Sequence, residues 1–138
     1  MKEIDALLDN PFFSTVAFYS VTILALVVFL AVFEFVTKYS NWQEIRKGNV
    51  AVAMATGGKI FGICNIFRFA IAENETVYYS LLWASFGFLL LLVAYFIFEF
   101  LTPGVKVDEE IKKDNRAVGL ISMIISISLS YVIGASVL

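Results

Sequence analysis

Four long apolar segments constrain this sequence more than any other feature. They cover roughly residues 16–36, 50–72, 77–101 and 117–138. Each has about 20 to 25 residues, which as a helix is enough to cross a hydrocarbon core of about 30 Å. Because 60% of the 138 residues are hydrophobic and only 16% are charged, a soluble domain of this size would expose too much apolar surface. We therefore expect an all-α integral membrane protein, a single domain over residues 1–138 with four transmembrane helices.

The sequence is also duplicated. Phe-Glu-Phe-Val-Thr at 33–37 returns as Phe-Glu-Phe-Leu-Thr at 98–102, and Glu-Ile-Arg-Lys-Gly-Asn at 44–49 returns as Glu-Ile-Lys-Lys-Asp-Asn at 110–115. Tandem repeats of this kind build pseudosymmetric membrane proteins with sites at the repeat interface. We assign residues 12–72 to repeat one and 77–138 to repeat two.

The basic residues predict the orientation of the chain. Most Lys and Arg residues lie in the connections after the first and third apolar segments, whereas the connection at 73–76 has none. Cytoplasmic loops are enriched in Lys and Arg, so both basic loops should face the cytoplasm and both termini should lie outside. Each repeat is then a hairpin that enters from outside and returns there, and the two hairpins are parallel.

One known family has these features. The run from Glu109 to Leu120, the duplicated Phe-Glu-Phe-x-Thr element and the turn at residues 102–104 resemble the bacterial family called domain of unknown function 350. The resemblance implies an uncharacterised, multi-pass protein of the bacterial inner (plasma) membrane. Family members are often encoded beside phage-shock-type coiled-coil proteins and ATP-grasp ligases, which implies a role in membrane stress or envelope maintenance.

The sequence lacks the residues that most catalytic mechanisms require. The chain has no His and one Cys, so it cannot form Ser-His triads, His-containing metal sites or an internal disulfide. We expect a packing role for the single cysteine, Cys64. Gly57-Gly58-Lys59 lies inside an apolar segment and lacks the strand-loop-helix context of a phosphate-binding loop. We therefore expect no enzymatic activity, no cofactor and no metal.

Lys59 is the strongest candidate for a functional residue. It lies about ten residues into the second segment, or about 15 Å deep, near the bilayer midplane. A lysine there costs on the order of 2.5 to 3.5 kcal/mol, so it should face the bundle interior, a wet cavity or a partner. Two interpretations stay open: a functional, cavity-lining charge, or a structural ion pair. The position equivalent to Lys59 in repeat two is Ile125.

Glu34 and Glu99 form a second candidate site. They occupy equivalent positions near the cytoplasmic ends of the first and third segments, where the helix dipole opposes a negative charge. The two carboxylates could meet near the pseudosymmetry axis and bind a cation or share a proton. Alternatively, each pairs with Arg46, Lys47 or Arg116 and locks its hairpin.

Several residues are expected to shape the helices. Asn49 and Asn115 precede the second and fourth segments, where asparagine caps helices. Stripes of small residues predict close helix contacts, one within the subunit and the other facing a second subunit; a serine ladder lining a hydrated path is the alternative. The stripes contain Gly58 and Gly62 in the second segment and Ser122, Ser126, Ser130 and Gly134 in the fourth.

The functional prediction combines these features. The loop with Lys112, Lys113 and Arg116 mixes acids and bases, so we expect a cytoplasmic protein partner there. The leading hypothesis is a non-enzymatic, self-associating component of a membrane-integrity or stress system, with no nucleic-acid partner. The rival is a small ion or solute channel or transporter in which Lys59 is the buried charge and Glu34 and Glu99 line the cytoplasmic mouth.

Overall fold

A computed structural model describes residues 2–74, 76–101 and 104–136 and is helical throughout its ordered elements. The long helices are α2 (Pro11–Val36), α4 (Val50–Glu73), α5 (Val77–Leu101) and α7 (Arg116–Ser136), and the short ones are α1 (Lys2–Leu8), α3 (Asn41–Arg46) and α6 (Val107–Lys112). The four long helices are long and apolar enough to cross a membrane. The all-α, four-helix membrane fold is therefore confirmed. Residues 102 and 103 of the predicted turn, and the last two residues of repeat two, lie outside the described residues.

The first long helix begins earlier than its apolar run suggested. The side chain of Asn10 accepts a hydrogen bond from the Phe12 amide at 2.9 Å, and Pro11 occupies the first helical turn. An asparagine N-cap followed by proline is a strong helix start. The helix therefore begins at Pro11 rather than near Val16, and its 26 residues make α2 about 39 Å long.

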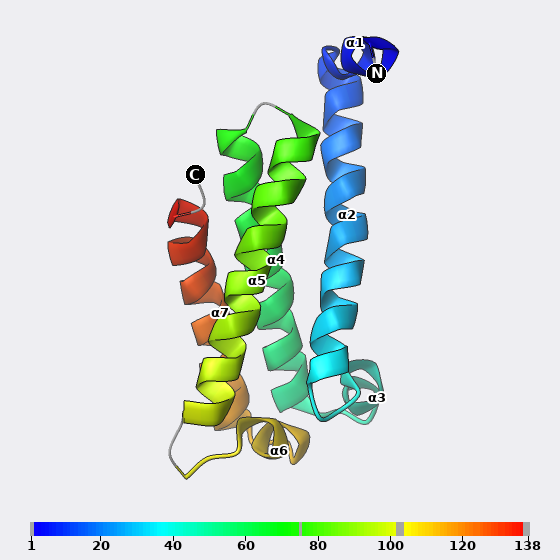
Figure 1. Cartoon of the computed structure of the whole chain (residues 1–138). Coiled ribbons are helices and arrows are strands. Elements are labelled where there is room, and N and C mark those ends of the chain that lie inside the picture. Colours follow the sequence, from blue (N-terminus) through cyan, green and yellow to red (C-terminus); the bar gives the residue numbers. More distant parts are fainter. Residues whose placement is uncertain (1, 75, 102–103, 137–138) are drawn as a thin grey trace.

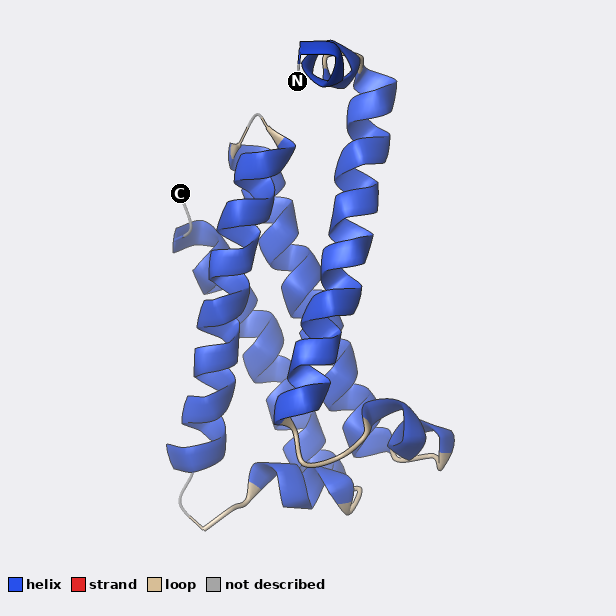
Figure 2. Cartoon of the chain, turned by 45° about the vertical axis from the view of Figure 1, so that its right-hand side comes forward, coloured by secondary structure: helices blue, strands red, loops and turns tan. Residues whose placement is uncertain are grey.

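The long helices form a bundle in which α4 is central. It packs against α7, α5 and α2, while α5 also contacts α2 and α7. Helix α1 and the C-terminal end of α7 lie toward one end of the bundle, whereas α3 and α6 lie at the opposite end (Figures 1 and 2). Which end faces the cytoplasm, and the parallel pairing of the two repeats, stay predictions.

Small residues let α4 and α7 approach closely. A Cβ at Gly58 would lie 2.7 Å from the Met123 Cα, and Gly62 faces Ser126 and Ser130 at ordinary contact distances or slightly less. Gly134 has the same role against the ring of Phe69. The two stripes therefore pack against each other within one subunit. This differs from the expectation that one stripe faces a second subunit, because the second helices of both repeats meet at the centre of the bundle.

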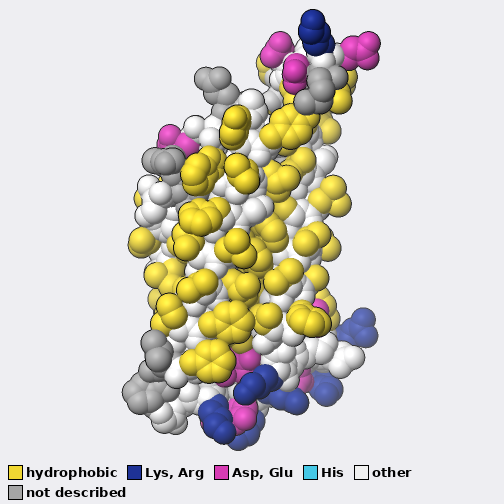
Figure 3. Space-filling model, in the orientation of Figure 1, with side chains coloured by type: hydrophobic (Ala, Val, Ile, Leu, Met, Phe, Trp, Pro, Cys, Tyr) yellow, Lys and Arg dark blue, Asp and Glu magenta, His cyan; other side chains and the backbone are white. Residues whose placement is uncertain are grey.

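The interior contains two apolar clusters. The larger one surrounds Phe33, Phe67 and Phe88 at mid-bundle. The smaller one lies at the α3–α6 end, where Val107 and Ile111 of α6, each 1% exposed, insert against the start of α4. On the face shown in Figure 3, hydrophobic side chains cover the middle of the surface, whereas most basic side chains gather at the α3–α6 end. Cys64 is exposed on this apolar surface, so it does not have the expected packing role.

Candidate functional site

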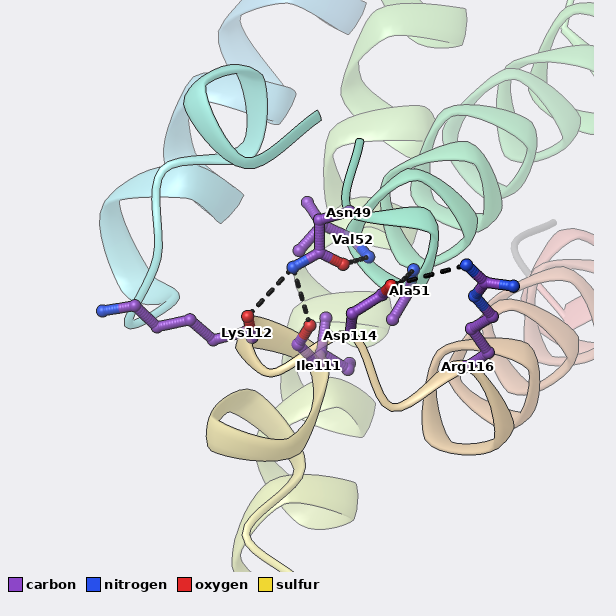
Figure 4. A network of polar contacts seen from close by, with 7 residues as sticks. All are labelled: Asn49, Ala51, Val52, Ile111, Lys112, Asp114 and Arg116. Atoms are coloured by element: carbon purple, nitrogen blue, oxygen red, sulfur yellow. Dashed lines mark hydrogen bonds and ion pairs between the residues drawn. The ribbon is translucent and has the colours of Figure 1, made fainter. Parts of the chain in front are cut away.

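Asparagine and aspartate side chains tie α6 to the start of α4. The side-chain Oδ1 of Asn49 accepts from the Val52 amide at 3.0 Å, and its Nδ2 donates to the carbonyls of Ile111 and Lys112 at 3.2 and 3.0 Å (Figure 4). Asp114 accepts from the Ala51 amide at 2.9 Å. Asn49 is thus both the cap of α4 and the clamp on the last turn of α6.

The connection between α6 and α7 has a related arrangement around Asn115. Its Oδ1 accepts from the Val118 amide at 3.4 Å, a long bond, and its Nδ2 donates to Glu110 at 2.9 Å. The residue before each capping asparagine has a positive φ, 86° at Gly48 and 63° at Asp114. Left-handed backbone favours Gly, Asn or Asp, which accounts for these residue types at equivalent positions of the two repeats.

Asp108 is buried by the docking of α6. The residue is 1% exposed. Its Oδ2 accepts from the Tyr95 hydroxyl at 2.5 Å and from the Lys38 amide at 3.2 Å, while its own amide donates to Glu99 Oε2 at 3.0 Å. Its Oδ1 has no hydrogen-bond donor among the described residues. A carboxylate so deeply buried requires a nearby positive charge.

That charge is Lys59. Its side chain is 2% exposed, and Asp108 is the carboxylate that interacts electrostatically with it. The ammonium lies over three aromatic rings, 5.0 Å from the centroid of Phe33, 5.3 Å from Tyr95 and 5.9 Å from Tyr39. Within the described part of the chain, Nζ has no hydrogen-bond acceptor. We call the side chains of Lys59, Asp108, Phe33, Tyr39 and Tyr95 the lysine cage.

The direction of helical side chains explains how Lys59 reaches the cage. Lys59 lies nine residues after Val50, the first residue of α4, so its backbone is about 14 Å into the helix. Helical side chains tilt toward the N-terminus, which here is the α3–α6 end. The long lysine stem therefore carries the charge back toward the loops, while its methylenes stay among apolar residues.

The aromatic contacts are strong enough to offset much or all of the cost of burying the Lys59 charge. A mid-membrane lysine costs on the order of 2.5 to 3.5 kcal/mol. Each aromatic face contributes about 0.5 to 2 kcal/mol to holding a cation, so three faces offset much or all of that cost before Asp108 is considered. Removing one member of such a buried pair costs about 3 to 5 kcal/mol, because the other charge is left uncompensated.

Tyr39 closes the cage on the loop side. The residue is 6% exposed, and its hydroxyl has no hydrogen-bond partner among the described residues. Burial, together with the carboxylates of Asp108 and Glu99, raises the pKa of Tyr39 well above its usual range. The phenol is therefore neutral at physiological pH. The stability that this neutral form contributes is fully present below the ordinary tyrosine pKa of about 10 and is lost as the pH rises through the raised value.

Little space remains around the cage. The cavity beside Lys59 has a volume of about 10 Å³ and is lined in part by Tyr95, Ser122 and Ser126, which is room for about one water molecule. Ser130, farther along α7, accepts from Asn65 at 3.0 Å and donates to the Ile127 carbonyl at 2.6 Å. These serines belong to a packed α4–α7 interface.

A much larger cleft is lined in part by Tyr39. Its volume is about 440 Å³. The residues that line it come from the end of α2, the α2–α3 connection, α3 and α6: Glu34, Thr37, Lys38, Tyr39, Ser40, Gln43, Glu44, Lys47 and Lys112. We call it the interfacial cleft. Tyr39 contributes to both the cleft and the lysine cage.

The structure divides the acidic residues that the sequence grouped together. Glu34 lines the interfacial cleft and accepts from Ser40 at 3.0 Å, whereas Glu99 accepts the Asp108 amide at 3.0 Å. The ion pairs in the described part of the chain are Lys47–Glu44 at 3.8 Å and Arg116–Asp114 at 3.7 Å. The predicted pairing of Glu34 and Glu99 with the basic residues of the next helix is therefore not seen. The connections fold into α3 and α6, which supply nearer partners.

Sequence reasoning missed the acidic partner of Lys59. Asp108 lies in the charged connection for which we expected a partner-binding loop rather than a buried carboxylate. Val107, Asp108 and Ile111 share one face of a short helix, and that spacing is the signal that could have revealed an inward-facing carboxylate. Within the described residues, no group of three or more Cys, Asp or Glu side chains could hold a metal ion.

Comparisons with known proteins agree with this architecture. The model of the family described as Domain of Unknown Function (DUF350) matches residues 6–137. The chain belongs to the DUF350 family. It is also 54% identical over 129 residues to the UPF0719 transmembrane protein YshE of Bacillus subtilis (strain 168), an alignment that covers 94% of this chain and 96% of the relative. No solved structure matches the chain. It is thus a multi-pass protein of the bacterial plasma membrane from an uncharacterised family, as its sequence motifs suggested.

Proposed function

We propose that this protein is a non-enzymatic, non-conducting membrane component that presents its α3–α6 end to a cytoplasmic protein and serves a membrane-integrity or stress system. One observation carries the proposal: the intramembrane charge is enclosed. Lys59 is 2% exposed, and the cavity beside it holds about 10 Å³. A conducting path requires continuous hydration or a chain of binding sites, whereas an enclosed charge surrounded by aromatic rings and a nearby carboxylate holds helices together.

The polar end of the bundle supports the second half of the proposal. Short helices α3 and α6 extend the charged surface beyond the transmembrane helices, and the basic side chains gather there (Figure 3). Glu109 and Lys112 are exposed on α6, as are Lys113, which follows α6, and Arg116, the first residue of α7. A surface with both signs of charge suits a protein with a complementary pattern better than a uniformly anionic surface.

Site-specific photocrosslinking in living cells tests the partner. A photoreactive amino acid at Glu109, exposed on α6, should give a discrete adduct with another protein. Reversing the charges of Lys113 and Arg116 to Glu should remove that adduct, because charge complementarity selects the partner. The same photoreactive residue at Tyr78, which is 54% exposed at the opposite end, is the matched control. Equal adducts from both positions, or an adduct insensitive to charge reversal, would contradict the proposal.

A second candidate function rests on the Lys59 ammonium, which has electrostatic contacts but no hydrogen bond to any described residue. Within the described residues it has no hydrogen-bond acceptor, and Ser122 and Ser126 line the small cavity beside it. Expansion of this cavity would create a polar path along α4 and α7, and the protein would then be a gated ion or solute conductor. This candidate predicts a flux that disappears when Lys59 is replaced by Leu.

A further inference from the structure

The interfacial cleft contains charges of both signs that come from separate elements. Lys38 lies on the α2–α3 connection, Lys47 follows α3, and Lys112 is the last residue of α6, while Glu34 lies in the last turn of α2. Figure 4 shows the Lys112 side chain extending away from the Asn49 network toward the α2–α3 connection. Lys112 therefore contributes its charge to the cleft only when α6 is docked.

Three of these charges lack an ion pair. Lys47 is paired with Glu44, but among the described residues Lys38, Lys112 and Glu34 have no ion-pair partner. Glu34 accepts a hydrogen bond from Ser40 through Oε1, and Lys38 interacts electrostatically with Glu99. The cleft thus offers free ammonium groups and a carboxylate with remaining acceptor capacity. A ligand with a phosphate and a primary amine would satisfy both kinds of group.

The position of the cleft indicates a lipid as the source of such a ligand. Glu34 and Thr37 lie where α2 ends, at Val36, so the cleft is at the boundary between the hydrocarbon and head-group regions. Trp42 on the adjacent α3 is 52% exposed, and tryptophan favours this level of a membrane. A volume of about 440 Å³ lies within the usual range of about 300 to 1,000 Å³ for ligand sites.

We propose that the interfacial cleft binds the phosphoethanolamine head group of a membrane lipid. The phosphate lies between Lys38 and Lys112 and accepts charge-assisted hydrogen bonds from their ammonium groups. The primary ammonium of the head group donates to Glu34. The lipid therefore bridges α6 and the α2–α3 connection, the same two segments that Asp108 joins from the inside.

The free carboxylate of Glu34 distinguishes this ligand from its alternatives. Phosphatidylglycerol has the phosphate but no ammonium, so Glu34 would repel it. Phosphatidylcholine has a quaternary ammonium that cannot donate a hydrogen bond to Glu34. Inorganic phosphate lacks both the amine and the acyl chains. The preference for an ethanolamine lipid is thus a direct consequence of the mixed charge of the cleft.

Native mass spectrometry of the full-length protein tests the proposal. The protein in detergent is given equimolar phosphatidylethanolamine, phosphatidylglycerol and phosphatidylcholine with identical acyl chains, and bound lipid is counted. Phosphatidylethanolamine should be retained at least threefold over each of the others. Glu34→Gln should lower its retention and raise that of phosphatidylglycerol. Preference of the wild type for phosphatidylglycerol, or displacement of bound lipid by millimolar inorganic phosphate, would overturn the proposal.

Adjacent lysines supply the matched control. Lys112→Gln should lower phosphatidylethanolamine retention at least threefold, whereas Lys113→Gln removes the same charge from the next residue, outside the cleft, and should leave retention unchanged. If the two substitutions lowered lipid retention equally, retention would depend on surface charge in general, and the proposed lipid site would be contradicted. Lys38→Gln, on a different segment, repeats the test if Lys112→Gln fails to fold. The photocrosslinking experiment leaves Lys112 intact, so the two proposals can fail separately.

Discussion

At the residue scale, the lysine cage contains two tyrosines that differ in how their hydroxyl groups are bonded. Tyr95 donates to the Asp108 carboxylate at 2.5 Å, whereas the hydroxyl of Tyr39 is buried without a partner among the described residues. Both rings contact the Lys59 ammonium. The two residues thus make a similar contribution to holding the cation, but only one of them uses its hydroxyl.

This difference predicts opposite effects of the same substitution. Tyr95→Phe should lower the free energy of unfolding by about 1.5 to 3 kcal/mol, because a hydrogen bond to a buried carboxylate is lost. Tyr39→Phe keeps the aromatic face and removes an unsatisfied hydroxyl, so it should be neutral or stabilising by up to about 1 kcal/mol. Thermal unfolding of the purified variants in detergent measures both. A destabilised Tyr39→Phe variant would show that the hydroxyl has a partner.

At the scale of elements, α6 is the part of the fold that sequence periodicity could not place. Six residues are too few for an isolated helix to be stable, so its position depends on tertiary contacts. Val107 and Ile111 insert beside α4, Asn49 binds its last carbonyls, and Asp108 faces Lys59. We infer that the electrostatic interaction between Asp108 and Lys59 is the strongest of these contacts.

Hydrogen exchange of the α6 amides tests that inference. Lys59→Met keeps the length of the side chain but leaves Asp108 uncompensated, at a cost of about 3 to 5 kcal/mol. Amides of residues 107–112 should then exchange at least tenfold faster, while those of α3, which carries no member of the lysine cage, should change little. Adding Asp108→Asn to the same variant should restore part of the protection. Unchanged exchange in α6 would mean that apolar contacts alone hold it.

At the scale of the whole molecule, apolar run length and family motifs were sufficient to predict four transmembrane helices. The helix start at Pro11 and the lysine cage were not predicted, for physical reasons. Asn10 and Pro11 extend α2 beyond its apolar run, and Asp108 is far from Lys59 in sequence. Lys59 was identified as a buried charge because lysine is costly in a membrane. The spacing of Val107, Asp108 and Ile111 could have indicated an inward-facing carboxylate, but its contact with Lys59 depends on where α6 packs.

The contact between α4 and α7 also bears on self-association. The small-residue stripes are used inside the subunit, so they do not supply a surface for a second copy. Self-association stays a prediction, and its surface would have to come from the exposed apolar faces of helices such as α2 and α5. The side chains that surround the Lys59 charge all come from one chain, so enclosing it requires no second subunit.

The most direct test of the account is ion flux through the purified protein in liposomes. Protons, alkali cations and chloride are measured for the wild type, for Lys59→Leu and for the Glu34→Gln, Glu99→Gln double variant, each shown to be folded by its circular dichroism. The enclosed Lys59 ammonium and the small cavity beside it predict no flux above that of empty liposomes for any ion. A wild-type flux that Lys59→Leu abolishes would contradict the account and establish the conductor.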